Sequence, residues 1–277
     1  SIRDRKESLG EFVNEATLKN LLDEMQLVVG DYENPETFGK LKEALAKFEL
    51  PVIYLAIAPA FFANVTQGLN AVGLTKSARV VVEKPFGRDL ESAIQLDESL
   101  KKLLPEDQIY RIDHYLGKES VEDLLVFRFA NTLFEPVWNR NYISNIQITM
   151  TEDFGVEGRG KFYDEVGATR DVLQNHLLQV LTMLTMEPPI DMDSHALQDE
   201  KFKVLSAIRE IKPEDVVRGQ FVGYLDEAGV VPHSDTETFV AMKLFIDNWR
   251  WAGVPIYLRT GKKMAETTME AVVEFKQ

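Results

Sequence analysis

The sequence has 277 residues, 45% of them hydrophobic, which is enough for one large domain or two ordinary domains with a substantial core. Its net charge of -14 argues against a general nucleic-acid surface, because phosphate backbones are bound by basic surfaces. The absence of cysteine excludes disulfides and thiolate metal sites, and no apolar run is long enough to span a bilayer. We therefore expect a soluble, cytoplasmic protein that binds neither nucleic acid nor membranes and holds no metal.

The first part of the chain alternates predicted helices and strands. Helical spacing of apolar residues predicts solvated surface helices over the first fifty residues. Short apolar runs then predict buried parallel strands, with helices between them, at 52–57 (strand), 61–69 (helix), 78–82 (strand), 89–103 (helix) and 108–112 (strand). Asp89 is the expected cap of the second helix. This order is typical of a doubly wound α/β sheet.

Polar motifs follow the second and third strands. The second strand leads into Glu83-Lys84-Pro85-Phe86-Gly87, and the third leads into the stretch from Arg111 to Glu119. Open α/β sheets bind ligands at the carboxyl ends of their strands, so we expect the two motifs to be neighbours at a binding edge. None of the 16 glycines falls in a Gly-x-Gly-x-x-Gly spacing, so these residues lack the turn that cradles a dinucleotide pyrophosphate.

The stretch from Arg111 to Glu119 combines an acid, an imidazole, a phenol and an amine, in Asp113, His114, Tyr115 and Lys118. Two cationic or potentially cationic groups beside a hydroxyl suit a phosphate dianion better than an apolar core. The acid has the chemistry to orient a base. A strand end that runs into a capped helix with a solvated first turn is the alternative, and this stretch alone does not decide between them.

Beyond this stretch the pattern changes. A helix is predicted at 121–130, and alternating runs predict strands at 143–152, 217–222, 236–247, 254–258 and 269–275. Such alternation is typical of a mixed or antiparallel sheet with one covered face. We therefore expect two domains, residues 1–113 with a partial parallel sheet and residues 114–277 with a large mixed or antiparallel sheet, an α/β plus α+β organisation.

A largely apolar helix is predicted from Ala168 to Thr185, and His176 falls on its apolar side. Asp171 and His176 are five residues apart, about 140° around an α-helix, so Asp171 is poorly placed to orient this histidine. If His176 is a base, its carboxylate partner must come from elsewhere. A core histidine satisfied by one hydrogen bond is the alternative.

Four motifs together resemble glucose-6-phosphate dehydrogenases over essentially the whole chain: Glu83 to Gly87, Arg111 to Glu119, Arg170 to His176, and Arg259-Thr260-Gly261-Lys262. The resemblance implies a Rossmann-type coenzyme domain followed by an α+β domain with a large sheet. It implies oxidation of glucose 6-phosphate at C1 to the lactone, with hydride passed to NADP or, in some members, NAD. It also implies a homodimer or homotetramer.

The resemblance also implies residue roles. The proton acceptor is His176, and the acid that pairs with it is Asp113. The other implied substrate residues are His114, Tyr115 and Lys118 at the phosphate, Glu152 and Asp171 at the sugar hydroxyls, Lys262, and Lys84 between substrate and nicotinamide. Glu83, Lys84 and Pro85 are the implied coenzyme residues. Without the resemblance, Glu152 and Lys262 would be interpreted as solvated surface charges.

Some features depart from the family. The chain begins after the family's glycine-rich turn and ends within a predicted strand, so we expect a fragment, which can fold yet lack activity. Thr267 stands where the family usually has a second basic residue, which weakens the expected phosphate site. Two alternatives remain: another NAD(P)-linked sugar oxidoreductase, and a catalytically silent sugar-phosphate-binding homologue. Sequence does not decide between NADP and NAD.

Overall fold

The computed structural model describes residues 14–277 and divides into two compact units, one ending at Ile112 and one beginning at Asp113. The predicted surface helices begin within residues 1–13, which lie outside the described residues. From Asn14 onward, the first fifty residues contain two helices, with an irregular stretch between them. Within residues 14–277, no helix combines the length and apolar character needed to cross a membrane.

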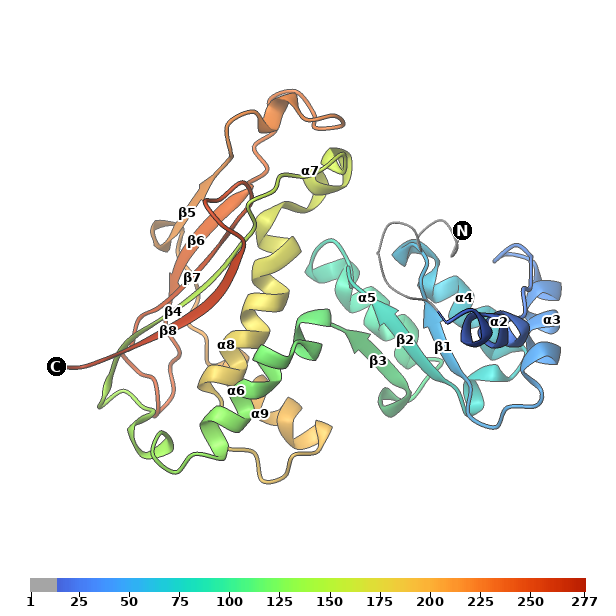
Figure 1. Cartoon of the computed structure of the whole chain (residues 1–277), viewed down its shortest axis with the longest axis horizontal. Helices are drawn as coiled ribbons and strands as arrows, with labels where there is room; N and C mark the ends of the chain where they lie inside the picture. Colours follow the sequence, from blue (N-terminus) through green and yellow to red (C-terminus); the bar gives the residue numbers. More distant parts are fainter. Residues whose placement is uncertain (1–13) are drawn as a thin grey trace. The chain divides into compact units, whose positions relative to one another are not determined.

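The first unit contains a three-stranded sheet with the order β1-β2-β3, in which both pairs are parallel (Figure 1). The strands are β1 (Val52–Leu55), β2 (Arg79–Glu83) and β3 (Ile109–Ile112). The helices are α2 (Glu15–Glu24), α3 (Pro35–Leu45), α4 (Phe62–Ala71) and α5 (Leu90–Lys101), with short 3-10 turns η1 (Pro59–Phe61), η2 (Leu74–Lys76) and η3 (Glu106–Gln108). The predicted parallel α/β sheet is confirmed.

The two faces of this sheet differ in burial. Val80 and Val82 are fully buried with residues of α3, α4 and α5. Val52 and Tyr54, by contrast, are 62% and 53% exposed. The expectation of a continuously buried first strand is therefore wrong, because the described residues cover only one face of the sheet.

The ends of β2 and β3 are fixed by register and by a helix cap. Glu83 pairs with Ile112, so both strands finish at the same edge of the sheet. Asp89 caps α5, as predicted: its carboxylate accepts a hydrogen bond from the Ser92 amide at 2.8 Å, and the Ser92 hydroxyl accepts one from the Asp89 amide at 3.1 Å. The turn from β2 into α5 is thereby held in place.

The second unit contains a five-stranded sheet with the order β5-β6-β7-β4-β8. Its strands are β4 (Ile143–Thr151), β5 (Val216–Gly219), β6 (Phe239–Leu244), β7 (Ile256–Gly261) and β8 (Thr268–Phe275). The pair β4–β7 is parallel and the other pairs are antiparallel. Each predicted alternating run overlaps one of these strands, so the predicted mixed sheet is confirmed.

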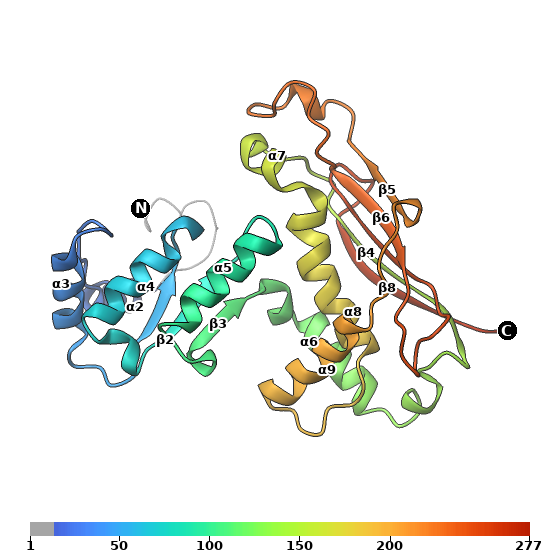
Figure 2. The ribbon, with the colours of Figure 1, turned by 180° about the vertical axis from the view of Figure 1, so that it is seen from behind.

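Helices cover one face of this sheet. The unit's helices are α6 (Glu119–Phe129), α7 (Gly160–Ala168), α8 (Leu178–Thr185) and α9 (Ser194–Ser206), and its 3-10 turns are η4 (His114–Gly117), η5 (Glu135–Val137), η7 (Pro213–Asp215) and η8 (Tyr224–Asp226). Two opposite views place α6, α8 and α9 on the same side of the sheet (Figure 1, Figure 2). Apolar residues of α8, such as Val180 and Leu181, pack with Ile146 and Ile148 of β4 in one core.

The predicted helix from Ala168 to Thr185 is not a uniform α-helix. Residues Thr169–Leu177 form a π-helix, η6, between α7 and α8. Gly167 enters it with φ 71° and ψ 170°, a backbone conformation that glycine adopts without strain. Glu237, from the loop before β6, accepts hydrogen bonds from the Thr169 amide at 3.0 Å and from the Thr169 hydroxyl. A distant carboxylate therefore caps the start of η6.

Candidate active site

Asp113 stands at the N-terminus of η4, directly after the last residue of β3. Its carboxylate oxygen Oδ1 accepts a hydrogen bond from the Tyr115 amide at 3.0 Å, which caps the turn. The same oxygen lies 2.5 Å from Nδ1 of His176, near the C-terminus of η6. The predicted contact between these two side chains is present.

The Asp113–His176 pair is shielded from water: the side chain of His176 is 2% exposed and that of Asp113 is 12% exposed. Burial raises the pKa of Asp113, but the hydrogen bond and charge of His176 and the Tyr115 amide lower it more, so its net pKa lies below the usual value. Because an ionised carboxylate only accepts hydrogen bonds, we assign the imidazole hydrogen to Nδ1. The other nitrogen, Nε2, is then the one that can accept a proton.

The winding of η6 changes the sequence argument about Asp171. In a π-helix the hydrogen bonds join residues five apart, so Asp171 and His176 lie roughly one turn apart rather than 140° apart. The premise that excluded Asp171 as the partner is therefore wrong, although the expected partner, Asp113, is in place. Asp171 instead lies 3.9 Å from the ammonium of Lys262.

Two of the three predicted phosphate residues lie against the His176 imidazole, and the third, Lys118, lies over the ring of one of them. The ring centroids of His114 and Tyr115 lie 4.7 Å and 4.2 Å from that of His176. The Lys118 ammonium lies 3.8 Å from the centroid of the Tyr115 ring, a cation–π geometry. His114 and Lys118 are exposed. An anion that binds at this turn would thus contact the exposed side chains of His114 and Lys118, with the buried imidazole of His176 beneath them.

Among residues 14–277, this group is also the one cluster of three or more His, Asp or Glu side chains close enough to suggest a metal site. Asp113, His114 and His176 each offer a ligand atom, and these atoms lie within 4.8 Å of one another. Ligands around one zinc ion are separated by about 3.3 Å, given bond lengths of about 2 Å and tetrahedral geometry. The Asp113–His176 contact is 2.5 Å, so this arrangement is a hydrogen-bonded pair and not a preformed metal shell.

A second cluster forms where β4 and β7 end side by side. The Glu152 amide donates to the Gly261 carbonyl at 3.0 Å, which fixes Glu152 beside Lys262. The Lys262 ammonium pairs with the Glu152 carboxylate and lies 3.9 Å from Asp171. Its side chain is only 4% exposed. The interpretation of Lys262 as a solvated surface charge is therefore wrong, and the structure brings together three of the predicted substrate residues.

Two aromatic residues at this cluster were not identified from the sequence. The Lys262 ammonium lies 5.4 Å from the ring centroid of Phe154 and 5.2 Å from that of Tyr163. Burial, and then the charge of Asp171, raise the pKa of Tyr163, so its phenol stays protonated. Phe154 and Tyr163 contact Lys262 from different segments of the chain, so their spacing in the sequence does not indicate that they cover this lysine.

Thr267, the position that departs from the family pattern, has a structural contact of its own. Its hydroxyl accepts a hydrogen bond from the Asp153 amide at 3.0 Å and donates one to the Asp153 carboxylate. The Thr267 side chain therefore holds the residue before β8 against the segment that follows β4.

Glu83, Lys84 and Pro85 lie in the first unit, at the end of β2. The Tyr54 hydroxyl donates a hydrogen bond to Glu83, and the Lys84–Pro85 peptide bond is cis. Gly87 has φ 109°, and a Cβ there would lie 2.5 Å from the Ala93 amide nitrogen, so the turn into α5 requires glycine. These residues stand at the carboxyl edge of a parallel sheet, where open α/β sheets bind ligands.

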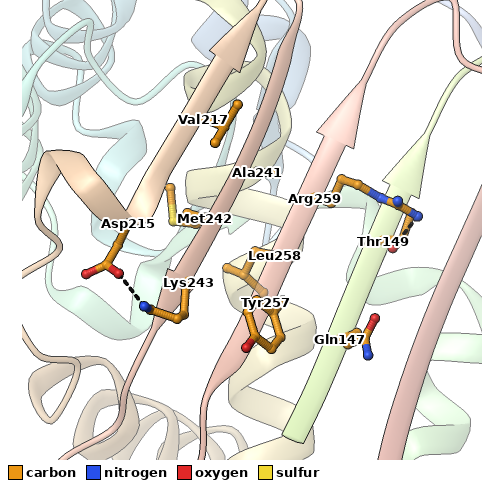
Figure 3. Close-up of a pocket in the computed structure, with 10 residues that line it drawn as sticks. All are labelled: Gln147, Thr149, Asp215, Val217, Ala241, Met242, Lys243, Tyr257, Leu258 and Arg259. Carbon is orange, nitrogen blue, oxygen red and sulfur yellow. Dashed lines mark hydrogen bonds and ion pairs between the residues drawn. The ribbon is translucent and has the colours of Figure 1, made fainter.

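A hollow of about 330 Å³ lies on the other face of the five-stranded sheet (Figure 3). Lys243 pairs with Asp215 on one side of it, and Arg259 donates to the Thr149 hydroxyl on the other. Alternation along β7 points Tyr257 and Arg259 outward while Leu258 and Thr260 are buried. None of the predicted site residues lines this hollow.

Comparison with known families places both units. Residues 2–123 match the model of the glucose-6-phosphate dehydrogenase NAD binding domain, and residues 125–277 match that of the glucose-6-phosphate dehydrogenase C-terminal domain. Glucose-6-phosphate 1-dehydrogenase 1 of Mycobacterium tuberculosis (strain CDC 1551 / Oshkosh) is 48% identical over 267 residues, which are 96% of this chain and 57% of the relative.

Solved structures agree. The crystal structure of glucose-6-phosphate 1-dehydrogenase from Mycobacterium avium superposes with a TM-score of 0.94 at 46% identity, over 99% of this chain and 61% of that one. A glucose-6-phosphate dehydrogenase in complex with its substrate glucose-6-phosphate superposes with a TM-score of 0.90 at 42% identity, over 95% of this chain and 58% of that one. The chain therefore spans somewhat more than half the length of these relatives.

Proposed function

The chain belongs to the glucose-6-phosphate dehydrogenase family, and from that premise we propose that it oxidises glucose 6-phosphate at C1 to 6-phosphogluconolactone with NADP as the hydride acceptor. This reaction is the first step of the oxidative pentose phosphate pathway. The observation that carries the proposal is the buried Asp113–His176 pair, 2.5 Å apart, behind a turn that carries a histidine, a tyrosine and a lysine. That arrangement joins a base to a phosphate-binding surface.

In the proposed mechanism His176 is the general base. Its Nε2 accepts the proton of the C1 hydroxyl as hydride leaves C1, so that the C1–O bond becomes the lactone carbonyl. Asp113 holds the imidazole in the required tautomer through Nδ1 and stabilises the imidazolium that forms. Bound coenzyme supplies the hydride acceptor.

The phosphate end of the sugar is assigned to His114, Tyr115 and Lys118. An ammonium and directional donors bind a dianion strongly, and this fixes the far end of the sugar and thereby the position of C1. Glu152 and Asp171 are assigned to the sugar hydroxyls, and Lys262 is assigned as a further substrate lysine. Their mutual ion pairs hold the carboxylates in place before the sugar arrives.

The first unit is assigned to coenzyme binding and the second to substrate binding and oligomerisation. Lys84 is assigned to the space between sugar and nicotinamide, with Glu83 and Pro85 beside it, because they stand at the carboxyl edge of a parallel sheet. No residue here is assigned to the pyrophosphate. We further propose a homodimer or homotetramer in the cytoplasm, and sedimentation measures that state directly.

A coupled assay tests the proposal in a protein of full family length carrying this chain. Reduced nicotinamide is followed with glucose 6-phosphate or glucose, each with NADP or NAD. We expect reduction that requires the phosphorylated sugar and is faster with NADP. Binding of glucose 6-phosphate without any reduction would indicate the silent homologue, and equal rates with glucose would indicate another sugar oxidoreductase.

A further inference from the structure

Glu237, two residues before β6, holds the start of η6 through both its backbone and its side chain. Its carbonyl oxygen accepts a hydrogen bond from the Ala168 amide at 2.9 Å. Its carboxylate oxygen Oε1 accepts hydrogen bonds from the Thr169 amide at 3.0 Å and from the Thr169 hydroxyl. A Cβ on Gly167 would lie 2.9 Å from that same oxygen, so glycine at this position allows the close approach. Three successive residues are therefore fixed by one glutamate.

Thr238, the next residue, holds the lysine of the second cluster. Its carbonyl oxygen accepts a hydrogen bond from the Lys262 amide at 2.9 Å. Thr238 is itself fixed, because its amide donates to the Gly219 carbonyl at 2.9 Å and its hydroxyl accepts from the Phe221 amide at 2.8 Å. Its side chain is fully buried. The segment before β6 is therefore a firm attachment point for the residues on either side of it.

This segment joins the acid and the ammonium of the second cluster. Asp171 follows Thr169 by two residues in η6, and its carboxylate lies 3.9 Å from the Lys262 ammonium. The two charged groups thus belong to segments that meet at Glu237 and Thr238. Because the backbone bond to Lys262 does not involve the Glu237 side chain, loss of that carboxylate would release only the η6 side.

We propose that Glu237 is a positioning residue of the proposed dehydrogenase, whose carboxylate sets the separation of Asp171 and Lys262 and thereby the affinity for glucose 6-phosphate. The inference rests on the proposed function. Groups that are held in place before the ligand arrives bind it without a further cost of ordering. The histidine end of η6 has an anchor of its own, the contact between His176 and Asp113, so proton transfer should depend little on Glu237.

The test compares KM and kcat among variants of a protein of full family length carrying this chain. Glu237→Gln removes the charge of the cap, and Thr169→Val removes its hydroxyl. For each we expect KM for glucose 6-phosphate to rise about three- to tenfold, with kcat within about twofold of the parent and KM for NADP unchanged. Thr169→Ser keeps the hydroxyl and should restore the parent KM. Glu227→Gln is the matched control, because it removes a carboxylate of the same loop that pairs with Lys263 at 3.7 Å, and it should leave KM unchanged.

A second comparison asks whether Glu237 acts through Asp171. If it does, adding Glu237→Gln to Asp171→Asn raises KM no further. A cap that only stabilises the fold would instead lower the thermal midpoint of Glu237→Gln without raising KM, or raise KM by the same factor in the Asp171→Asn background; either pattern overturns the proposal. Should Glu237→Gln not fold, the same comparison is made with Thr169→Val.

Calorimetric affinity for glucose 6-phosphate, measured beside KM, separates this proposal from the proposed function. A parent that binds the sugar phosphate but reduces no coenzyme refutes the proposed function, and the role of Glu237 is then decided by the affinities of the same variants. A parent that neither binds nor reacts refutes both. An active parent whose Glu237→Gln and Thr169→Val variants keep its KM refutes only the role of Glu237.

Discussion

The two ends of η6 carry similar side chains in opposite arrangements. Near its C-terminus, one acid, Asp113, contacts one imidazole, that of His176, through Nδ1. Near its N-terminus, two acids, Glu152 and Asp171, share one ammonium, that of Lys262. In the proposed mechanism the first arrangement accepts a proton, whereas the second exchanges some of its ion pairs for sugar hydroxyls.

This difference suggests separate roles for the two ends of η6, with proton transfer at the histidine end and substrate positioning at the lysine end. A buried ion pair contributes little net stability, yet removing one partner is costly because the other is left uncompensated. We therefore expect changes at the histidine end to act mainly on kcat. Changes at the lysine end should act mainly on KM and on the free energy of unfolding.

The largest effect is expected for His176→Asn. If this variant kept its turnover, the proposed difference between the two ends of η6 would be wrong. The amide fills much of the same space but cannot accept a proton at neutral pH, so kcat should fall by about 10²- to 10⁴-fold. Calorimetric affinity for glucose 6-phosphate should stay within about threefold, since the phosphate residues remain. His195→Asn, at an exposed histidine of α9, is the matched control and should match the parent.

A smaller loss is expected for Asp113→Asn. The amide oxygen can still cap Tyr115, but the side chain no longer stabilises an imidazolium, so kcat should fall by about 10²-fold or more, and by no more than in His176→Asn. If kcat falls while KM rises as much as in a phosphate-site variant, the carboxylate acts on binding, and the division between the two ends of η6 is not valid.

Acid unfolding of the same variant sharpens this result. Because the pKa of Asp113 is lowered in the folded protein, its ionised form contributes stability above the unfolded value of about 4, and that stability is lost as pH falls through the lower folded value. The gap in thermal midpoint between the parent and Asp113→Asn should therefore narrow below about pH 4. A constant gap would contradict the assignment.

At the lysine end, Lys262→Met removes the ammonium that pairs with Glu152 and lies 3.9 Å from Asp171. We expect a loss of about 1–3 kcal/mol in the free energy of unfolding and a KM for glucose 6-phosphate raised about tenfold. Adding Glu152→Gln should restore part of the free energy of unfolding, which a double-mutant cycle by urea denaturation would measure. It should not lower the raised KM for glucose 6-phosphate. Recovery of KM in the double variant would argue against substrate contact by Lys262.

The smallest effect is expected for Thr267→Val. Loss of the hydroxyl removes the hydrogen bonds with Asp153, which should cost about 0.5–1.5 kcal/mol. KM should stay within about twofold, because this side chain stabilises the end of β4 and is not assigned to the phosphate. A clear rise in KM would move Thr267 into the binding site.

The sequence predicts the sheets and the histidine end of η6 well. Alternation and apolar runs report directly on strand faces, and His176 falls on the apolar side of its helix at any winding close to α. The pairing with Asp113 required the family resemblance, since the two residues are 63 positions apart.

Other features depend on distant contacts that local patterns do not encode. The π winding of η6 depends on Gly167 and on Glu237, which lies 68 residues from Thr169. Burial of Lys262 depends on rings from two other segments.

The π winding of η6 also has an evolutionary consequence. Five residues of a π-helix cover about the angle that four residues cover in an α-helix. Consider a relative with one residue fewer between the acid and the histidine, in which this segment is an α-helix. Both side chains would still lie on the same side of the helix, and the following helix would keep the same face toward the sheet. Variation of this interval by one residue is therefore a length change that the site can absorb, and alignment of relatives over residues 171–176 would reveal it.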